Sequence, residues 1–228
     1  MASSLQPTSP ICPRRLLLVD HHPLLRRGLR HLLETEPDLI VCAEAATPEA
    51  GLAAIAAHLP DLVITELSFR GGDGLEMVKD ITKRFPMIPV LVLSMREEVI
   101  YAERALRAGA RGYVAKHELN DEVIQAVRRV LAGELHTSSA LSRQFAGRYL
   151  ASPVTIAKTG VGLLSDRELE VFQMIGSGQA TGRIARALGL SVKTIESHRV
   201  NLKLKLQLPS GSALARTALL WVETGRLS

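Results

Sequence analysis

Four polar side chains stand at the ends of short apolar runs in the first half of the chain. Asp20 follows the run RLLLV and Glu66 follows LVIT, while Ser94 closes VLVLS and Lys116 closes GYVAK. If these runs are parallel strands, their carboxyl ends meet at one edge of a sheet, where ligands of such sheets bind. Two acids, a hydroxyl and an ammonium group would suit an oxyanion or a divalent cation there. The sequence therefore predicts a polar site at this edge.

The spacing of apolar residues over 14–132 predicts the elements that position this site. Buried strands alternate with stretches of helical periodicity, which is typical of βαβ units and a parallel sheet covered on both faces. Thr47, Pro48 and Glu49 provide a cap, a first-turn proline and a first-turn acid for one helix. We expect strands within 15–19, 39–43, 62–65, 90–94 and 112–116, and helices over 23–34, 47–58, 74–85, 97–107 and 120–132.

A second region, residues 164–228, has only helical patterns. Ser165 and Glu168 have the spacing of a capping box, while Gly189 ends one helix and Ser191 caps the next, which is helix-turn-helix spacing. The pattern predicts a small all-helical domain with helices over 166–176, 181–188, 191–206 and 212–223. We also expect a flexible tail over 1–13 and a linker over 133–163 with one short helix around 140–150.

The charge of the chain is uneven. Lys and Arg number 28 against 23 Asp and Glu, and the whole excess lies in residues 151–228. This excess indicates an anionic partner, with an ordinary solvated basic face as the alternative. No run reaches the roughly 18–20 apolar residues of a membrane span, and the N-terminal stretch lacks a signal-peptide pattern. With only Cys12 and Cys42, free thiols in the cytoplasm are expected.

Four motifs of the first region resemble the receiver domain of bacterial two-component response regulators. They are LLLVDHHPLLRRGL, PDLVITELSFRGGDGLEM, VLVLSMREE and AGARGYVAKHE, in the order and spacing of that family over residues 14–132. The resemblance implies a five-stranded flavodoxin-like fold in which an aspartate after the third strand accepts a phosphoryl group from a histidine kinase. It also implies that an acidic pair after the first strand helps to bind Mg²⁺, and that a Ser/Thr and a Lys recognise the phosphoryl group.

The resemblance assigns the family's site residues by position. Asp20 corresponds to the first acid and Ser94 to the hydroxyl, while Lys116 corresponds to the lysine and Tyr113 to the aromatic switch residue. Two positions depart from the family, because His21 replaces the second acid and Glu66 replaces the acceptor aspartate. An imidazole matches Mg²⁺ poorly, and a glutamate carries its carboxylate further from the backbone by about one C–C bond, roughly 1.5 Å. Misplacement of about 1 Å can cost about 100-fold in a positioned reaction. Both departures therefore weaken metal-dependent phosphorylation.

The departures predict a receiver that acts independently of phosphorylation. Glu66 offers a permanent charge and is a partial mimic of a phosphate; a structural salt bridge in a vestigial site is the alternative. Asp61 is expected at the opposite end of its strand, and Asp73 in a turn formed by GGDG, so neither should replace the acceptor. His21 and His22 could bind a metal or sense pH, but the sequence has no further Cys or His at ligand spacing from them. Neither a metal site nor a cofactor is therefore expected.

The helix predicted over 191–206 has two different sides. In a helical projection Ile195, Val192, Leu202 and Leu206 share the apolar side, and Arg199 falls toward it. The opposite side mixes cations with small polar and apolar groups: Lys193, Ser197, Val200, Asn201 and Leu204, flanked by Thr194, Glu196 and Lys203. Such a surface can contact phosphates and read base edges in a major groove, although a generic amphipathic helix looks similar.

Residues 164–223 resemble the LuxR/FixJ-type helix-turn-helix domain, with LSDRELEV, IARALGLS, KTIESHRVN and a terminal helix as matching features. Joined to a receiver, this segment is similar to the NarL/FixJ class of response regulators. The resemblance implies that 180–199 form the helix-turn-helix and that the helix from Val192 enters the major groove of double-stranded promoter DNA. It implies base contacts from Lys193, Ser197 and Val200, and phosphate contacts from Thr181, Thr194, Arg199 and Lys203.

Two residues depart from the helix-turn-helix pattern. Gly182 stands where a lysine is common in the family, which weakens contact with the DNA backbone. Glu196 is an acid on the DNA-facing side, so it either reads a cytosine amino group or repels phosphate. For the last helix, SALARTALLWVE, the resemblance implies that it joins two copies of the chain in a homodimer. The alternative is that this helix only closes the core of its own domain.

Two functions therefore compete. The first is a DNA-binding transcription regulator with an atypical receiver, and the second is an adaptor that acts through protein partners at the receiver and binds DNA weakly or not at all. An enzyme is not expected, because the sequence offers no paired nucleophile and base and no phosphate-binding glycine loop.

Overall fold

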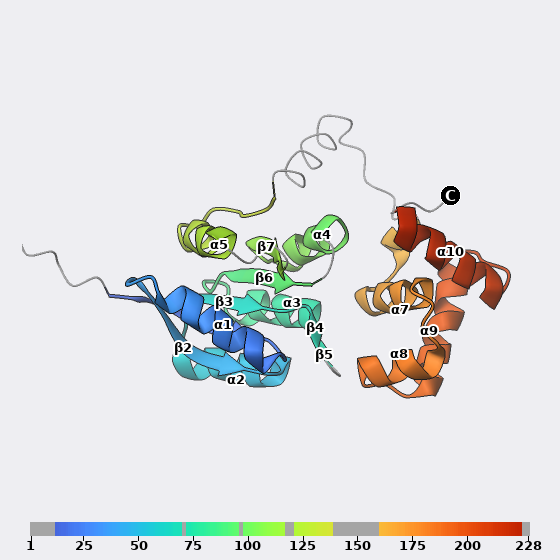
Figure 1. The fold of residues 1–228 in the computed structure, drawn as a ribbon, viewed down its shortest axis with the longest axis horizontal. Coiled ribbons are helices and arrows are strands. Elements are labelled where there is room, and N and C mark those ends of the chain that lie inside the picture. The colour runs from blue at the N-terminus through green and yellow to red at the C-terminus, as the bar shows by residue number, and fades with distance from the viewer. Residues whose placement is uncertain (1–11, 70–71, 96–97, 117–120, 139–159, 225–228) are drawn as a thin grey trace, which may run out of the picture. The chain divides into compact units, whose positions relative to one another are not determined.

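The computed structural model describes residues 12–69, 72–95, 98–116, 121–138 and 160–224. The chain forms two compact units, Met1–Gly147 and Arg148–Ser228 (Figure 1). Each unit has buried hydrophobic residues of its own, such as Leu16 in the first and Phe172 in the second. None of the helices in the described ranges is long and apolar enough to cross a membrane. The short helix expected around 140–150, most of the tail expected over 1–13 and the centre of the linker expected over 133–163 lie outside these ranges.

The first unit contains a five-stranded parallel sheet in the order β2-β1-β3-β6-β7. Its strands are β1 Arg14–Val19, β2 Leu39–Ala45, β3 Leu62–Thr65, β6 Val90–Ser94 and β7 Gly112–Ala115. Its helices are α1 Pro23–Glu34, α2 Pro48–His58, α3 Gly74–Arg84, α4 Glu98–Ala108 and α5 Asp121–Leu131. The predicted flavodoxin-like receiver fold is therefore confirmed.

Helices cover both faces of the sheet (Figure 1). On one face, Leu33 of α1 and Val127 of α5 belong to the same buried cluster as Ile64 of β3. Helices α2, α3 and α4 contact strands from the other face, where the hydroxyl of Thr65 lies 3.7 Å from the sulfur of Met77. Because both faces are covered, the strands are nearly continuous apolar runs, which is the pattern that predicted them.

Short polar side chains fix the helix starts. Thr47 caps α2 by accepting a hydrogen bond from the third N–H beyond it, as its position predicted. Asp73 caps α3 by accepting from two N–H groups of its first turn. The prediction of a simple turn for GGDG was incomplete, because β4 Ser68–Phe69 pairs antiparallel with β5 Gly72–Asp73. This two-stranded ribbon connects β3 to α3.

The second unit contains only helices in its described part, as predicted. They are the 3-10 helix η2 Gly160–Leu163, α7 Asp166–Gly176, α8 Thr181–Leu188, α9 Val192–Lys205 and α10 Gly211–Thr224. Ser165 and Glu168 form the expected capping box at the start of α7. Gly189 ends α8 with a φ of 65°, a left-handed conformation that favours glycine, and Ser191 caps α9.

Helix α10 completes the core of the second unit. Its residues Leu214, Ala218 and Trp221 are buried, and the ring centroid of Trp221 lies 5.6 Å from that of Phe172 on α7. A side chain at Gly176 would bring its Cβ within 2.4 Å of the Ala218 carbonyl oxygen. The glycine therefore permits the close approach of α7 and α10, and α10 is part of the fold whatever else it binds.

Candidate functional site

The carboxyl edge of the sheet brings the predicted polar residues together. Asp20 follows β1, Glu66 follows β3, Ser94 ends β6 and Lys116 follows β7, and all four side chains are buried. The ammonium group of Lys116 lies between the two carboxylates and forms ion pairs with both. We call Asp20, Glu66, Ser94 and Lys116 the receiver pocket.

Glu66 uses both of its carboxylate oxygens within the receiver pocket. Its Oε1 accepts hydrogen bonds from the Ser94 hydroxyl and from the backbone N–H groups of Leu67 (2.6 Å) and Ser68 (3.1 Å). Its Oε2 pairs with Lys116. A buried charge is tolerated when it is paired and hydrogen-bonded in this way. The longer side chain thus reaches the hydroxyl and the lysine that the family uses for a phosphoryl group.

The backbone around Glu66 is fixed by a close approach of two segments. The N–H of Gly74 donates to the carbonyl of Leu67 at 3.0 Å, at the end of the β4-β5 ribbon. A Cβ at Gly74 would lie 2.4 Å from the Cα of Leu67, so no other residue fits there without a shift of the backbone. This contact helps to hold the two N–H groups that donate to Glu66.

Both carboxylate oxygens of Asp20 also have partners. Its Oδ2 lies 2.5 Å from the Lys116 ammonium, and its Oδ1 accepts from the backbone N–H of His22 at 2.7 Å. The guanidinium of Arg26 donates to the Asp20 carbonyl at 2.5 Å, which ties the end of β1 to α1. The sequence did not identify Arg26, and only its position one turn into α1 could have indicated this contact.

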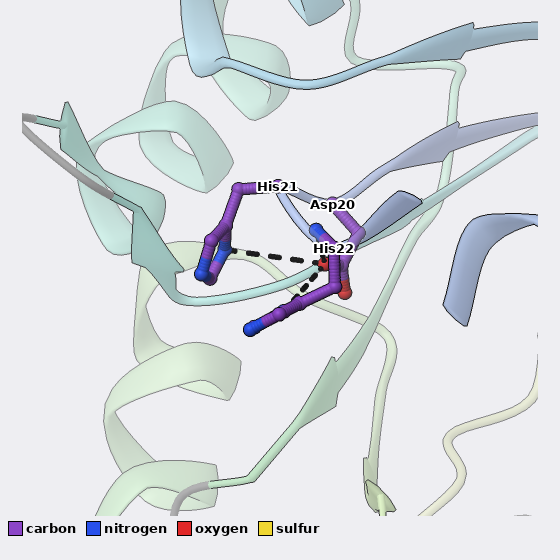
Figure 2. Close-up of side chains that lie close together, drawn as sticks. All are labelled: Asp20, His21 and His22. Atoms are coloured by element: carbon purple, nitrogen blue, oxygen red, sulfur yellow. Dashed lines mark hydrogen bonds and ion pairs between the residues drawn. The ribbon is translucent and has the colours of Figure 1, made fainter. Parts of the chain in front are cut away.

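The two histidines after β1 lie against Asp20 (Figure 2). The Nδ1 of His22 is 3.1 Å from Asp20 Oδ1 and the Nδ1 of His21 is 3.9 Å from the same oxygen. The ring centroids of the two histidines are 3.7 Å apart. Burial lowers the pKa of His21 and the neighbouring His22 lowers it further, while the carboxylates of Asp20 and Glu66 oppose the shift.

Tyr113 lies inside the unit on β7, where its side chain is buried. Burial raises the pKa of its phenol, and a hydrogen bond with Ser94 opposes part of that shift. The aromatic position named by the sequence is therefore connected to the receiver pocket through Ser94.

The two other acids considered as acceptors lie elsewhere. Asp61 accepts from the backbone N–H of Arg15 at 2.7 Å and from the Arg14 side chain at 3.3 Å, at the opposite end of the sheet. Asp73 caps α3. Asp61 thus lies at the opposite end of its strand from Glu66, as predicted, and Asp73 accepts hydrogen bonds from the first turn of α3.

The receiver pocket does not fit the Mg²⁺ ion that receivers employ. Mg²⁺ needs several oxygen ligands in near-octahedral geometry, and here both pocket carboxylates are paired with the ammonium of Lys116. The second acid of the family is the imidazole of His21, a softer donor. Both features disfavour Mg²⁺ at this position.

In the second unit, α9 exposes most of the side chains predicted to face DNA. Lys193, Glu196, Ser197 and Val200 are exposed, whereas Thr194, Arg199 and Lys203 are half-buried along the edges of this face, as is Thr181 at the start of α8. We call these eight residues the α9 surface. Asn201 and Leu204 extend it toward the C-terminal end of the helix.

Two details of α9 differ from the sequence expectation. Val192 was expected on the buried side and is 53% exposed, so that prediction was wrong. Burial on α9 begins one turn later, at Ile195, because Val192 is the first residue of the helix. Glu196 also lies 3.9 Å from Arg199, one turn along the helix, so its charge is partly balanced within the α9 surface.

Two side chains of α7 hold α8 and α9 in place. Arg167 donates to the carbonyl of Leu188 at 2.7 Å, and Glu168 accepts from the Lys205 ammonium at 2.6 Å. Burial opposes ionisation of Glu168, but hydrogen bonds from Lys205 and Ser165 keep its pKa below the usual value. The sequence identified Glu168 only as a capping residue. Its pairing with Lys205 links positions 37 residues apart, which local patterns do not reveal.

Comparisons with known proteins agree with this geometry. Residues 16–128 match the response regulator receiver domain, and 162–218 match the luxR family of bacterial regulatory proteins. The oxygen regulatory protein NreC of Staphylococcus epidermidis is 31% identical over 90% of this chain and 96% of its own. The transcriptional activator protein ExaE of Pseudomonas putida is 36% identical over 93% and 97%.

A solved structure covers both units. RcsB from Salmonella enterica serovar Typhimurium, bound to promoter rprA in the presence of phosphomimetic BeF3−, is 26% identical, with a TM-score of 0.61 over 90% of this chain and 97% of that one. The matches to these two relatives and to this structure each cover at least 90% of this chain, and so extend over both units. The chain belongs to the NarL/FixJ class of response regulators, which join a receiver domain to a LuxR-type helix-turn-helix domain.

Proposed function

We propose that this chain is a DNA-binding transcription regulator whose receiver domain acts without aspartyl phosphorylation. The observation that carries the proposal is the set of contacts around Glu66, which bonds with both Lys116 and Ser94. In the family the same two side chains recognise a phosphoryl group. A carboxylate that already engages them leaves no place for that group.

Glu66 imitates a phosphorylated aspartate only in part. A carboxylate carries about one negative charge, against about −1.5 to −2 for a phosphate, and has fewer acceptor oxygens. It nevertheless contacts both Lys116 and Ser94. We propose that the receiver pocket is held in a single state by this contact, and that any regulatory input acts through another partner or effector.

The α9 surface is the proposed DNA-binding element. Its exposed residues Lys193, Ser197 and Val200 would lie near bases, while the residues at its edges would contact phosphates: Thr181, Thr194, Arg199 and Lys203. The ion pair of Glu196 with Arg199 favours a moderating role for Glu196 over base reading. The promoter complex of RcsB supports DNA as the ligand of this domain type.

A homodimer is the proposed form that binds DNA. Leu219, Leu220 and Val222 on α10 are 46%, 41% and 41% exposed, although the buried side of the same helix is fully packed. Two copies joined there would contact two half-sites about one helical turn apart. The proposed location is the cytoplasm, and no cofactor enters the proposal. As a member of a family of regulators, the chain is not an enzyme.

The test is genome-wide selection of DNA fragments by the untreated protein, repeated with Glu66→Ala and Glu66→Asp. We expect the wild type to select specific fragments without a phosphodonor, and acetyl phosphate with Mg²⁺ to change neither its mass nor its affinity. A covalent adduct on Glu66, or DNA binding that requires the phosphodonor, would contradict phosphorylation independence.

The two variants test the role of the carboxylate. Loss of binding only in Glu66→Ala, with a circular dichroism spectrum that shows the variant to be folded, supports a partial mimic. No effect in either variant supports a vestigial pocket. A salt titration on random DNA separates the regulator from the adaptor, because phosphate contacts make affinity fall steeply with salt. Absence of any salt-dependent binding would favour the adaptor.

A further inference from the structure

Three potential metal ligands converge directly after β1. One ligand atom from each of Asp20, His21 and His22 lies within 4.8 Å of the others (Figure 2). From Asp20 Oδ1, the distances to the Nδ1 atoms of His22 and His21 are 3.1 and 3.9 Å. Ligands about 2.0–2.2 Å from a zinc ion lie about 3.3–3.6 Å from one another in a tetrahedral site. The two distances from Asp20 Oδ1 lie within about 0.3 Å of that range.

One of these ligand atoms lacks a hydrogen-bond partner. The Nδ1 of His21 is buried, and the 3.9 Å to Asp20 is too long for a hydrogen bond. A buried polar atom without a partner is uncommon and costs free energy. Coordination to a cation would satisfy it. The His22 side chain is 55% exposed, so the cluster is open to solvent on that side.

We propose that Asp20, His21 and His22 form a binding site for a borderline divalent cation of the zinc type. Two imidazoles and one carboxylate are ligands that Zn²⁺, Co²⁺ and Ni²⁺ accept and Mg²⁺ does not favour. The replacement of an acid by His21 thus changes which cation the site prefers, and does not simply abolish cation binding. From sequence alone the histidines lacked a further ligand; the structure adds Asp20.

The surrounding contacts prepare the carboxylate for this role. The backbone N–H of His22 donates to Asp20 Oδ1 at 2.7 Å, and Lys116 pairs with Oδ2, so the side chain is held on both sides. Partners of this kind orient metal ligands. With Glu66 nearby, two carboxylates face one ammonium, which leaves one net negative charge beside the site.

The experiment measures Zn²⁺ and Co²⁺ binding to the untagged full chain by calorimetry, together with the visible absorption spectrum of bound Co²⁺. The variants are His21→Ala and His22→Ala, and the matched control is His31→Ala with His58→Ala, which removes two surface histidines outside the cluster. Circular dichroism checks the fold. Because His22 is largely exposed, its variant remains informative if His21→Ala does not fold.

We expect one Zn²⁺ per chain, a Co²⁺ spectrum of nitrogen coordination, and affinity lowered about tenfold or more by either cluster variant. The control should bind as the wild type does, and a large excess of Mg²⁺ should not compete. Equal affinity of His22→Ala and wild type, loss of binding in the control, or displacement by Mg²⁺ would each overturn the proposal. DNA binding that persists in the cluster variants would leave the proposed function intact while the metal site is judged separately.

Discussion

The ammonium group of Lys116 and the carboxylate of Glu66 form an ion pair in which each side chain is only 2% exposed. Two charges removed from water pay a desolvation cost, so such a pair is stable only when its remaining atoms also have partners. Lys116 has its second partner in Asp20, and Glu66 has its own in Ser94 and two backbone N–H groups. Removal of Lys116 would therefore leave two buried carboxylates without their cation, whereas removal of Glu66 would leave Lys116 paired with Asp20.

The first prediction is that Glu66→Ala destabilises the receiver domain by about 1–3 kcal/mol, the usual cost of leaving buried hydrogen-bond donors without an acceptor. The variant leaves Lys116 with one carboxylate and leaves the Ser94 hydroxyl without its acceptor on Glu66. Urea unfolding of the full chain, followed by circular dichroism, gives the free energy difference. The control is Glu76→Ala, which removes a 63% exposed carboxylate paired with Lys79 and should cost less than about 1 kcal/mol. Equal effects of the two substitutions would show that the buried pair is not a stabilising contact.

The second prediction concerns restoring the family's chemistry. Glu66→Asp alone should remain without a phosphoryl group after treatment with acetyl phosphate and Mg²⁺, because His21 still occupies the position of the second acid. The double variant His21→Asp with Glu66→Asp provides the oxygen ligands that Mg²⁺ prefers and should gain one phosphoryl group by intact mass. Adding Lys116→Met to the double variant is the control and should abolish the gain. A phosphorylated wild-type protein would contradict the role assigned to Glu66.

The sequence predicted the fold well because its signals are local. Apolar runs and helical periodicity specify the strands and helices, and Thr47, Ser165 and Gly189 mark helix ends by their own chemistry. The sequence also predicted that Asp20 and Lys116 lie close together, because the carboxyl ends of parallel strands share one edge of the sheet. These features depend on topology rather than on side-chain detail.

Side-chain pairing could not be predicted in the same way. Lys116 contacts a carboxylate 96 residues away, and which oxygen it selects depends on rotamers fixed by the surrounding packing. The position of Val192 was misjudged because a helical projection assumes that a helix is covered along its whole length. The predicted roles of the α9 surface and of the receiver pocket stay predictions for experiment.

The third prediction is a pH dependence at the start of α7. Burial opposes ionisation of Glu168, yet hydrogen bonds from Lys205 and Ser165 hold its pKa below the usual 4.5. A depressed folded-state pKa means that the stabilisation is fully present above about 4.5 and is lost as pH falls through the lowered value. Wild type should therefore exceed Glu168→Gln in free energy of unfolding near neutral pH, with the difference shrinking in acid. Urea unfolding over a pH series measures it, and a difference that grows as pH falls would have the wrong sign.

The fourth prediction concerns a single phosphate contact. Lys203→Ala should weaken binding to all DNA sequences alike and reduce the slope of log affinity against log salt by about 1, because one phosphate contact releases about one counterion. Fluorescence anisotropy at several salt concentrations measures the slope. Lys79→Ala, which removes a cation from α3 in the first unit, is the control and should leave the slope unchanged. A change in sequence preference with Lys203→Ala would instead indicate a base contact.

The last prediction tests the outer side of α10. Leu219 and Leu220 are exposed while Trp221 is buried, so Leu219→Glu should place a charge in the proposed dimer interface without disturbing the core. We expect sedimentation to show a shift from dimer to monomer and DNA affinity for paired half-sites to fall, with unchanged circular dichroism. Leu24→Glu is the matched control, since Leu24 is 82% exposed on α1 in the other unit and should not affect assembly. If Leu24→Glu abolished the dimer and Leu219→Glu did not, the dimer interface would lie in the receiver domain, which contains Leu24.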